Sequence, residues 1–391
     1  MRAAPSQEEV RRQNLGALLR YVHRHGPTSR AELTARLRLN RSTIGALTTD
    51  LTAAGLVHEE APEAGRAGRA GRPSLVVSPR SELVCAYAVA VETDRVSVAR
   101  VGLGGVPLGR RAVARDPDQG PPELAKVVAT AVRELDAAAP AQVRRVGTGV
   151  AVTAGPPEAG GGRGRPPPDP DPLRAALAAA VPVGPVAFGS TADLAALAEQ
   201  VRGVAAGCDH VIYLSGEVGV TAGMITGGRP LRAPTGRVGE VGHMVVNPAG
   251  RRCRCGSRGC WETEVGQPAL LRAAGRTGVA GRDAIRAVMD AAARGDVVAR
   301  AAVRQVGDWL GLGVGNLVNI FHPQMIIFGG HLRDVYLVAA ARLRSRLNMV
   351  ALAESRNTVR LRTPSLGDDA PLIGAAELAF EALVEDPLAP A

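Results

Sequence analysis

A short segment rich in cysteine and histidine constrains this chain more than any other feature. Three of the five cysteines, Cys253, Cys255 and Cys260, fall within eight residues, and His243 lies ten residues before the first of them. One imidazole nitrogen and three thiolates complete a tetrahedral shell, so the pattern predicts a closed structural zinc site. Because such a shell leaves no open position, we expect the metal to hold a loop rather than to perform chemistry.

The residues around these cysteines fit a metal loop. Arg252, Arg254 and Arg258 are expected to keep the thiolates deprotonated. Gly256 and Gly259 tolerate the positive φ angles that a loop folding back around an ion needs. A disulfide loop with a spare thiol is the weaker alternative, since three clustered thiols beside a histidine cannot all pair in disulfides.

Composition places the chain among globular proteins. Its 391 residues suffice for two or three domains, and 46% are hydrophobic but only 3% aromatic, so the core must consist of Ala, Val and Leu. We find no apolar run of membrane-spanning length and no apolar signal region, and we expect a cytoplasmic protein without a membrane partner. Cys85 and Cys208 are expected to be inert packing residues.

Positive charge is concentrated at the N-terminal end. Residues 1–80 contain 13 arginines and 7 acidic residues, an excess of six out of the net +10 of the whole chain. This excess favours a polyanionic partner for the N-terminal region.

The first eighty residues predict three helices. Apolar residues at helical spacing run through 8–25, and Gly26-Pro27 interrupts them. Ser29 and Glu32 form the sequence pattern of a capping box that opens a second helix ending at Leu37. Asn40 is placed to cap a third helix, which Gly55 ends.

The third helix has the composition of a DNA recognition helix. Its apolar residues point inward, and its outer face carries small or polar residues: Arg41, Ser42, Thr43, Gly45, Ala46 and Thr49. A major groove admits such a helix closely, so the helix-turn-helix arrangement predicts double-stranded DNA as a partner. An ordinary helical bundle with a polar surface is the alternative.

A β-hairpin wing is expected next, with strands at 56–59 and 75–77. Its tip carries Arg66, Arg69 and Arg72 on a glycine-rich backbone. Guanidinium groups spaced in this way suit a narrow minor groove. A solvated linker between domains explains the same composition equally well.

The remaining residues alternate between strand and helix patterns, which is typical of an α/β fold with mixed sheets. A hairpin meander occurs twice, near 83–113 and 211–225, and an exposed loop is expected at 160–172. We therefore predict a winged helix-turn-helix domain over 1–80. A ligand-sensing domain of two related lobes, with a cleft for a small molecule, is predicted over 81–391.

Several motifs resemble the ROK family, which comprises repressors, uncharacterised reading frames and sugar kinases. The resemblance covers nearly the whole chain, and its motifs are Gly239-Glu240-Val241-Gly242-His243, the cysteine spacing with Gly259-Cys260-Trp261-Glu262, Asn316-Leu317-Val318-Asn319 through Pro323 to Gly329-Gly330, and Leu366-Gly367 with Pro371 to Ala376. It implies a two-lobed, actin-like sugar-kinase fold and a zinc site. The added winged helix is similar to the repressor branch, which includes xylose and N-acetylglucosamine repressors.

Three departures from the family's kinases predict that the chain is not an enzyme. The ATP-phosphate loop is replaced by Ala90-Val91-Glu92-Thr93-Asp94, whose acids would repel a polyphosphate. The second glycine-rich turn reads Gly219-Val220-Thr221-Ala222-Gly223, with one glycine replaced by Thr. The Asn-Asp pair that carries the catalytic base falls on Ser190-Thr191, and a Thr hydroxyl cannot act as a base near neutral pH.

By the same resemblance, Glu240, His243 and Glu262 are the residues that contact a sugar, and His243 is shared with the metal. We therefore expect a sequence-specific transcriptional regulator, a repressor of carbohydrate-related genes that a sugar or sugar phosphate controls. A homodimer or homotetramer is expected from the symmetry of DNA sites. An active sugar kinase with an appended DNA-binding domain, or a regulator that answers to a protein partner, is the alternative.

Overall fold

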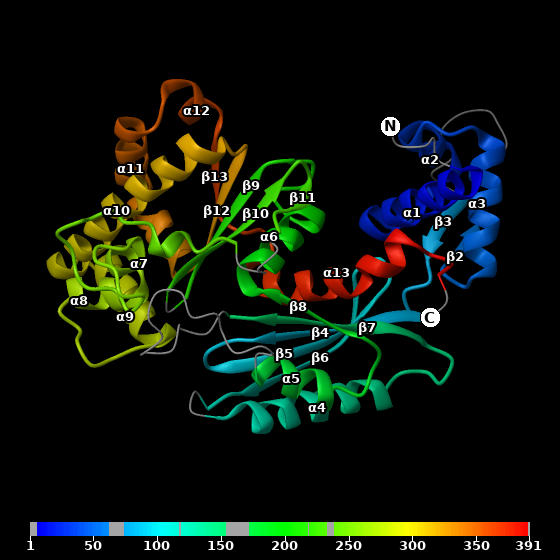
Figure 1. The fold of residues 1–391 in the computed structure, drawn as a ribbon, viewed down its shortest axis with the longest axis horizontal. Coiled ribbons are helices and arrows are strands. Elements are labelled where there is room, and N and C mark those ends of the chain that lie inside the picture. The colour runs from blue at the N-terminus through cyan, green and yellow to red at the C-terminus, as the bar shows by residue number, and fades with distance from the viewer. Residues whose placement is uncertain are drawn as a thin grey trace. The chain divides into compact units, whose positions relative to one another are not determined.

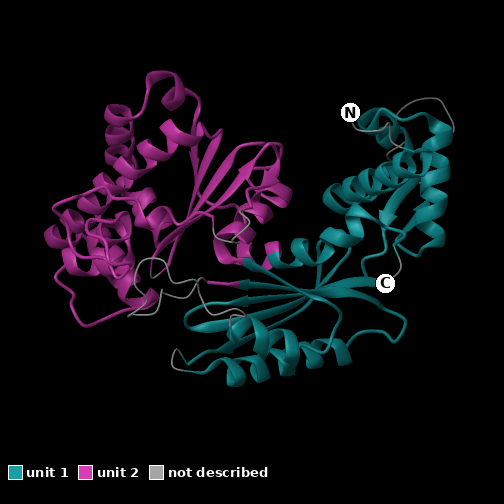
Figure 2. Ribbon diagram, in the orientation of Figure 1, with its two compact units in different colours: residues 1–151, 172–189, 375–391 teal, residues 152–171, 190–374 magenta. Residues whose placement is uncertain are grey.

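The computed structural model describes residues 6–61, 74–116, 119–153, 172–217, 219–232 and 238–389 (Figure 1). The chain divides into two compact units (Figure 2). The first comprises residues 1–151, 172–189 and 375–391, and the second comprises 152–171 and 190–374. No helix in the described ranges is both long and apolar enough to span a bilayer. The domain limits expected from the sequence, 1–80 and 81–391, stay a prediction.

The N-terminal part of the first unit is a winged helix. Helices α1 (Gln7–His25), α2 (Arg30–Leu37) and α3 (Arg41–Ala53) pack against a three-stranded sheet with the order β1 (Thr28–Ser29), β3 (Val76–Pro79), β2 (Val57–Glu60). The side chains of Ser6, Ser29 and Asn40 each accept the backbone N–H three residues later, which fixes where the three helices begin. The three predicted helices and the hairpin are confirmed.

A five-stranded sheet forms the rest of the first unit. Its order is β6 (Val106–Ala114), β5 (Arg95–Gly102), β4 (Val84–Val91), β7 (Arg144–Val152), β8 (Val186–Ser190). Helices α4 (Pro121–Ala137) and α5 (Pro172–Ala180) lie on one face, and the part of α13 (Ala370–Glu385) that belongs to this unit lies on the other (Figure 1). Gly149 permits this approach, because a Cβ there would come within 1.8 Å of the Ala375 carbonyl oxygen.

Helix α13 also completes the core of the winged helix. Phe380, Leu383 and Val384 belong to the same buried cluster as the apolar faces of α1, α2 and α3. At the edge of this cluster the buried His23 of α1 lies 3.0 Å from the Glu377 carboxylate, and the Gly104 N–H donates to its Nδ1 over 2.9 Å. The C-terminal helix α13 is therefore part of the fold of the N-terminal winged helix.

The second unit contains a mixed five-stranded sheet. Its order is β11 (Arg229–Pro230), β10 (Val220–Thr226), β9 (Val211–Gly216), β12 (Met325–Gly330), β13 (Arg360–Arg362). Strand β9 pairs antiparallel with β10 and parallel with β12. Read from the hairpin edge, both sheets have the same strand order, so the predicted repeat of the meander is confirmed, as is the α/β class.

Alternation along the strands of this sheet builds two separate cores. Val211 and Tyr213 face helix α6 (Thr191–Arg202), whereas Ile212 and Leu214 face the opposite helical layer. That layer consists of α7 (Trp261–Val265), α8 (Gln267–Ala273), α9 (Arg282–Ala293), α10 (Val297–Phe321) and α11 (His331–Val350), with α12 (Ala353–Thr358) beside its end.

Candidate metal centre and DNA-binding surface

The Gly-Glu-Val-Gly-His segment lies directly against strand β10. It forms a single 3-10 turn over Val241–His243. Gly239 has a φ of 84°, and a Cβ there would come within 1.8 Å of the Ala222 carbonyl oxygen. A Cβ at Gly242 would come within 2.3 Å of the Val220 carbonyl oxygen. Neither position has room for a Cβ, because the segment packs closely against the backbone of β10. This packing fixes the position of His243.

The cysteine-bearing loop folds back on itself through backbone hydrogen bonds. The Cys253 N–H donates to Ser257 O over 2.8 Å, and the Gly259 N–H donates to Arg251 O over 2.8 Å. Gly256 and Gly259 have φ angles of 86° and 71°, as predicted. A Cβ at Gly259 would lie only 1.6 Å from Asn247 O, so this glycine is needed for space as well as for its φ.

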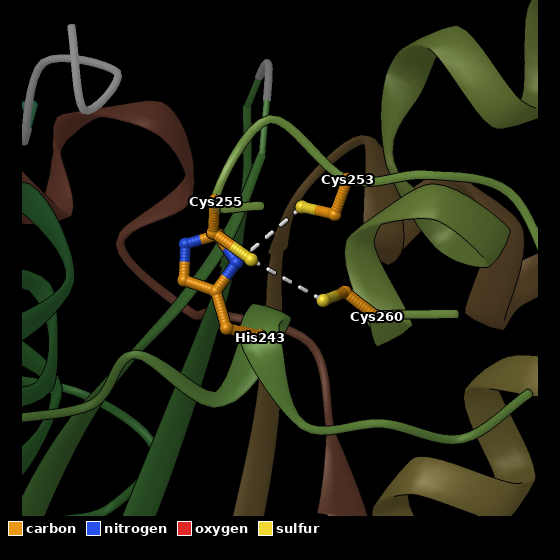
Figure 3. Close-up of side chains that lie close together, drawn as sticks. All are labelled: His243, Cys253, Cys255 and Cys260. Carbon is orange, nitrogen blue, oxygen red and sulfur yellow. Dashed lines mark hydrogen bonds between the residues drawn. The ribbon is translucent and has the colours of Figure 1, made fainter. Parts of the chain in front are cut away.

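This loop brings the four predicted metal ligands together (Figure 3). One ligand atom from each of His243, Cys253, Cys255 and Cys260 lies within 4.8 Å of all the others. His243 Nδ1 is 3.7 Å from Cys253 Sγ, and the sulfurs of Cys255 and Cys260 are 3.6 Å apart. Sulfurs bound to one tetrahedral zinc ion are separated by about 3.8 Å, whereas a disulfide bond measures about 2.05 Å. The donor set and its spacing fit a zinc ion.

The last cysteine is tied to the helical layer of the second unit. Cys260 immediately precedes Trp261, whose side chain is fully buried and whose indole N–H donates to Trp309 O on α10 over 2.9 Å. Gly313 of α10 makes room for the ring, because a Cβ there would come within 2.1 Å of the indole. The metal loop is thus anchored to α10.

Burial raises the pKa of the Cys253 thiol, and the Glu262 carboxylate 3.1 Å away acts in the same direction. Two of the three arginines expected to offset this, Arg254 and Arg258, have other partners. Arg254 Nε lies 3.7 Å from Glu262, and Arg258 donates to Gly250 O over 3.1 Å. A bound cation is therefore the natural source of the positive charge that the thiolates need. Burial likewise raises the pKa of Cys85 to about 11, as expected for an inert packing residue.

The three residues expected to contact a sugar gather around one imidazole. Glu240 Oε2 lies 3.8 Å from His243 Nε2, and Glu262 Oε1 lies 3.8 Å from His243 Nδ1. The nitrogen that faces the thiols is Nδ1, so Nε2 is left for other partners. The Glu240 side chain is 43% exposed and that of Glu262 only 10%, so Glu240 is the more accessible carboxylate.

Ser190 and Thr191, which the family resemblance predicts in place of the kinases' Asn-Asp pair, form the start of helix α6. Ser190 Oγ accepts the Asp193 N–H over 3.1 Å and donates to Asp193 Oδ2 over 2.6 Å. The Thr191 hydroxyl lies 3.2 Å from that of Thr153. Asp193, whose pKa is raised by burial, was not among the residues singled out from the sequence. The Ser-x-x-Asp capping pattern at 190–193 could have identified it. In the segment predicted to replace the ATP-phosphate loop, the buried Glu92 carboxylate pairs with Arg95.

The face of α3 carries the predicted DNA-binding residues in two groups. Arg41, Ser42, Ala46 and Thr49 are exposed, whereas Thr43 and Gly45 are half-buried. Two residues of the helix are therefore less accessible than the pattern implied. The expected minor-groove residues Arg66, Arg69 and Arg72 lie outside the described residues.

Comparison with known proteins gives two family matches. The model of the ROK family matches residues 93–382, and that of the MarR family matches residues 16–67. The xylose repressor of Bacillus spizizenii is 31% identical over 50% of this chain and 51% of its own length. The transcriptional dual regulator NagC of Escherichia coli is 32% identical over 48% of each chain. The chain thus spans about half the length of these curated relatives.

A solved structure is similar over nearly the whole chain. The crystal structure of a ROK family transcriptional regulator, described as a homologue of the E. coli MLC protein, has a TM-score of 0.74 at 23% identity. It covers 96% of this chain and 97% of its own. This likeness shows the fold: a winged helix-turn-helix followed by the actin-like, kinase-type domain.

Proposed function

This chain belongs to the ROK family, and from that premise we propose that it is a DNA-binding transcriptional repressor controlled by a sugar or sugar derivative. The observation that carries the proposal is the winged helix with its exposed recognition face on α3, joined to a kinase-type domain. The relatives named as repressors support it.

In this proposal α3 enters the major groove, and Arg41, Ser42 and Thr49 reach phosphates and base edges. Two copies of the chain place their α3 helices in successive grooves, so the active form is a homodimer or a homotetramer. The arginine-rich segment with Arg66, Arg69 and Arg72 contributes minor-groove contacts.

The effector is proposed to bind beside His243. Nδ1 and the thiolates of Cys253, Cys255 and Cys260 would hold a structural zinc ion, and Nε2 with the Glu240 and Glu262 carboxylates would accept and donate to vicinal hydroxyls. The ion would fix the loop and the imidazole orientation. A ligand then shifts DNA affinity only through its different affinity for the two forms of the protein.

We propose no phosphotransfer activity. By the family resemblance, Thr191 stands where the kinases have their catalytic Asp. Its hydroxyl contacts the Thr153 hydroxyl and cannot act as a general base near neutral pH. Neither ATP hydrolysis nor phosphate transfer should rise when sugars are added to the protein. Sugar-dependent transfer above a blank without protein would overturn this part of the proposal.

A footprinting experiment tests the whole proposal. The full-length protein is incubated with the DNA upstream of its own gene at moderate salt, with and without a panel of sugars and sugar phosphates. We expect a protected region that one class of sugar releases. Arg41→Ala should weaken protection, whereas Arg344→Ala, at an exposed position on α11, should not. Absence of protection for the wild-type protein contradicts the proposal.

A further inference from the structure

A hollow lies in the second unit, beside the metal loop. Its volume is about 550 Å³, which is within the range of small-molecule sites. The loop, α7, α8 and α10 all contribute to its wall. Neither Glu240, His243 nor Glu262 lines it, so it is separate from the proposed effector site.

Three arginines line this hollow: Arg251, Arg258 and Arg272. Within the described ranges of the chain, none of them forms an ion pair. Arg258 Nη1 donates to Gly250 O over 3.1 Å, and Arg272 Nη2 donates to Thr263 O over 3.0 Å. Since a guanidinium has five N–H donors, both retain donors for a ligand.

The acidic lining does not balance this charge. Glu264 is the one carboxylate in the wall, and its Oε1 already accepts from Asn247 Nδ2 over 2.9 Å. Three guanidinium groups against one carboxylate leave an excess of two positive charges. Burial lowers the pKa of the half-buried Arg272, and the nearby charge of Arg251 acts in the same direction. The negative charge of an anion in the hollow would act against this lowering of the Arg272 pKa.

We propose that this hollow binds a phosphate ester. A guanidinium presents a planar fork of N–H donors that matches two oxygens of a phosphate or of a carboxylate. A phosphate group has more acceptor oxygens than a carboxylate, so it suits a site with several guanidinium groups better. The remaining wall offers Thr263 and Gln305 as partners for hydroxyl groups. A small phosphorylated polyol satisfies the charge, the polarity and the volume together.

The site is built into the metal loop itself. Arg252 pairs with Arg258 across a short antiparallel bridge, and Arg251 accepts the Gly259 N–H through its carbonyl oxygen. A phosphate that bridges Arg251 and Arg258 to Arg272 therefore ties the loop to α8. The inference goes beyond the proposed function, because it assigns a second ligand to a second site.

Calorimetry and ³¹P NMR on the full-length protein test the assignment with glycerol 3-phosphate as the probe. Inorganic phosphate, citrate and glycerol are compared at the same ionic strength. The double variant Arg251→Gln/Arg258→Gln and the single variant Gln305→Glu alter the hollow, and Arg344→Gln removes one exposed charge elsewhere. DNA footprints and release by neutral sugars are recorded for every variant.

We expect saturable binding of glycerol 3-phosphate by the wild type and by Arg344→Gln. Both hollow variants should bind roughly tenfold more weakly or worse, with DNA binding and the response to neutral sugars retained. Glycerol alone should not bind. Equal affinities of the wild type and the double variant would overturn the proposal, as would citrate binding as tightly as the phosphate ester. Because DNA binding is measured separately, failure here is distinguishable from failure of the proposed function.

Discussion

At the scale of single residues, substitutions of two glycines in the metal loop distinguish the cost of backbone strain from the cost of a steric clash. Gly256 and Gly259 both have positive φ, but a Cβ at Gly256 would meet nothing within 4 Å, whereas one at Gly259 would lie 1.6 Å from Asn247 O. Gly256→Ala should cost only the left-handed strain of about 1–2 kcal/mol. Gly259→Ala should cost more, because the loop must also open and the four ligands must separate.

Metal content and thermal unfolding check this pair of substitutions. We expect zinc near one equivalent per chain in the wild type and in Gly256→Ala, and a clear loss of zinc in Gly259→Ala. Equal zinc content in the two variants would show that the close approach to Asn247 does not hold the loop.

At the scale of elements, helix propensity and packing favour different residues at Gly16, where α1 contacts α13. Alanine exceeds glycine in helix propensity by about 1 kcal/mol, so propensity alone predicts that Gly16→Ala stabilises α1. A Cβ at this position, however, would lie 2.8 Å from Glu385 O and 3.0 Å from Val384 O. We expect packing to win, with a net loss of about 1–3 kcal/mol in the free energy of unfolding.

Chemical denaturation of the full-length protein measures this change. Gln13→Ala, an exposed substitution on the same helix, serves as the control and should alter the free energy of unfolding by less than about 0.5 kcal/mol. A more stable Gly16→Ala variant would mean that the contact between α1 and α13 yields easily.

The recognition face of α3 gives a further prediction at this scale. Ala46 is exposed on that face, so Ala46→Glu should preserve the fold but place a negative charge against the phosphates. We expect a loss of DNA affinity of at least about tenfold at moderate salt. Ala301→Glu, at an exposed position on α10, should leave DNA affinity unchanged. Equal affinity of both variants would remove α3 from the interface.

Local patterns predicted most elements, because they depend on spacing and caps. Asn40 and Ser29 marked the starts of α3 and α2, and the repeated hairpins marked both sheets. The clustering of His243 with the three cysteines was predictable because these four donors are close in sequence. The pairing of α13 with α1 was not predictable, because it joins residues more than 350 positions apart, as His23 and Glu377 show. The hollow beside α8 also arises only from tertiary packing.

At the scale of the whole molecule, the winged helix and the metal loop belong to different compact units. The winged helix shares one buried cluster with α13 and with Val84 and Ala86 of β4, all in the first unit. The metal loop is anchored to α10 in the second unit. Loss of the metal should therefore disturb His243 and Glu262 directly while sparing the core beneath α3.

Removal of zinc with a chelator tests this division. We expect the treated protein to retain its DNA footprint but to lose release by sugar, because His243 and the loop no longer hold the effector site. Readdition of zinc should restore the response, and Cys260→Ser should reproduce the effect of the chelator without any treatment. A footprint that disappears on chelation and returns with zinc would instead mean that the metal supports DNA binding by the winged helix itself. An unchanged sugar response in the metal-free protein would separate the metal from effector binding altogether.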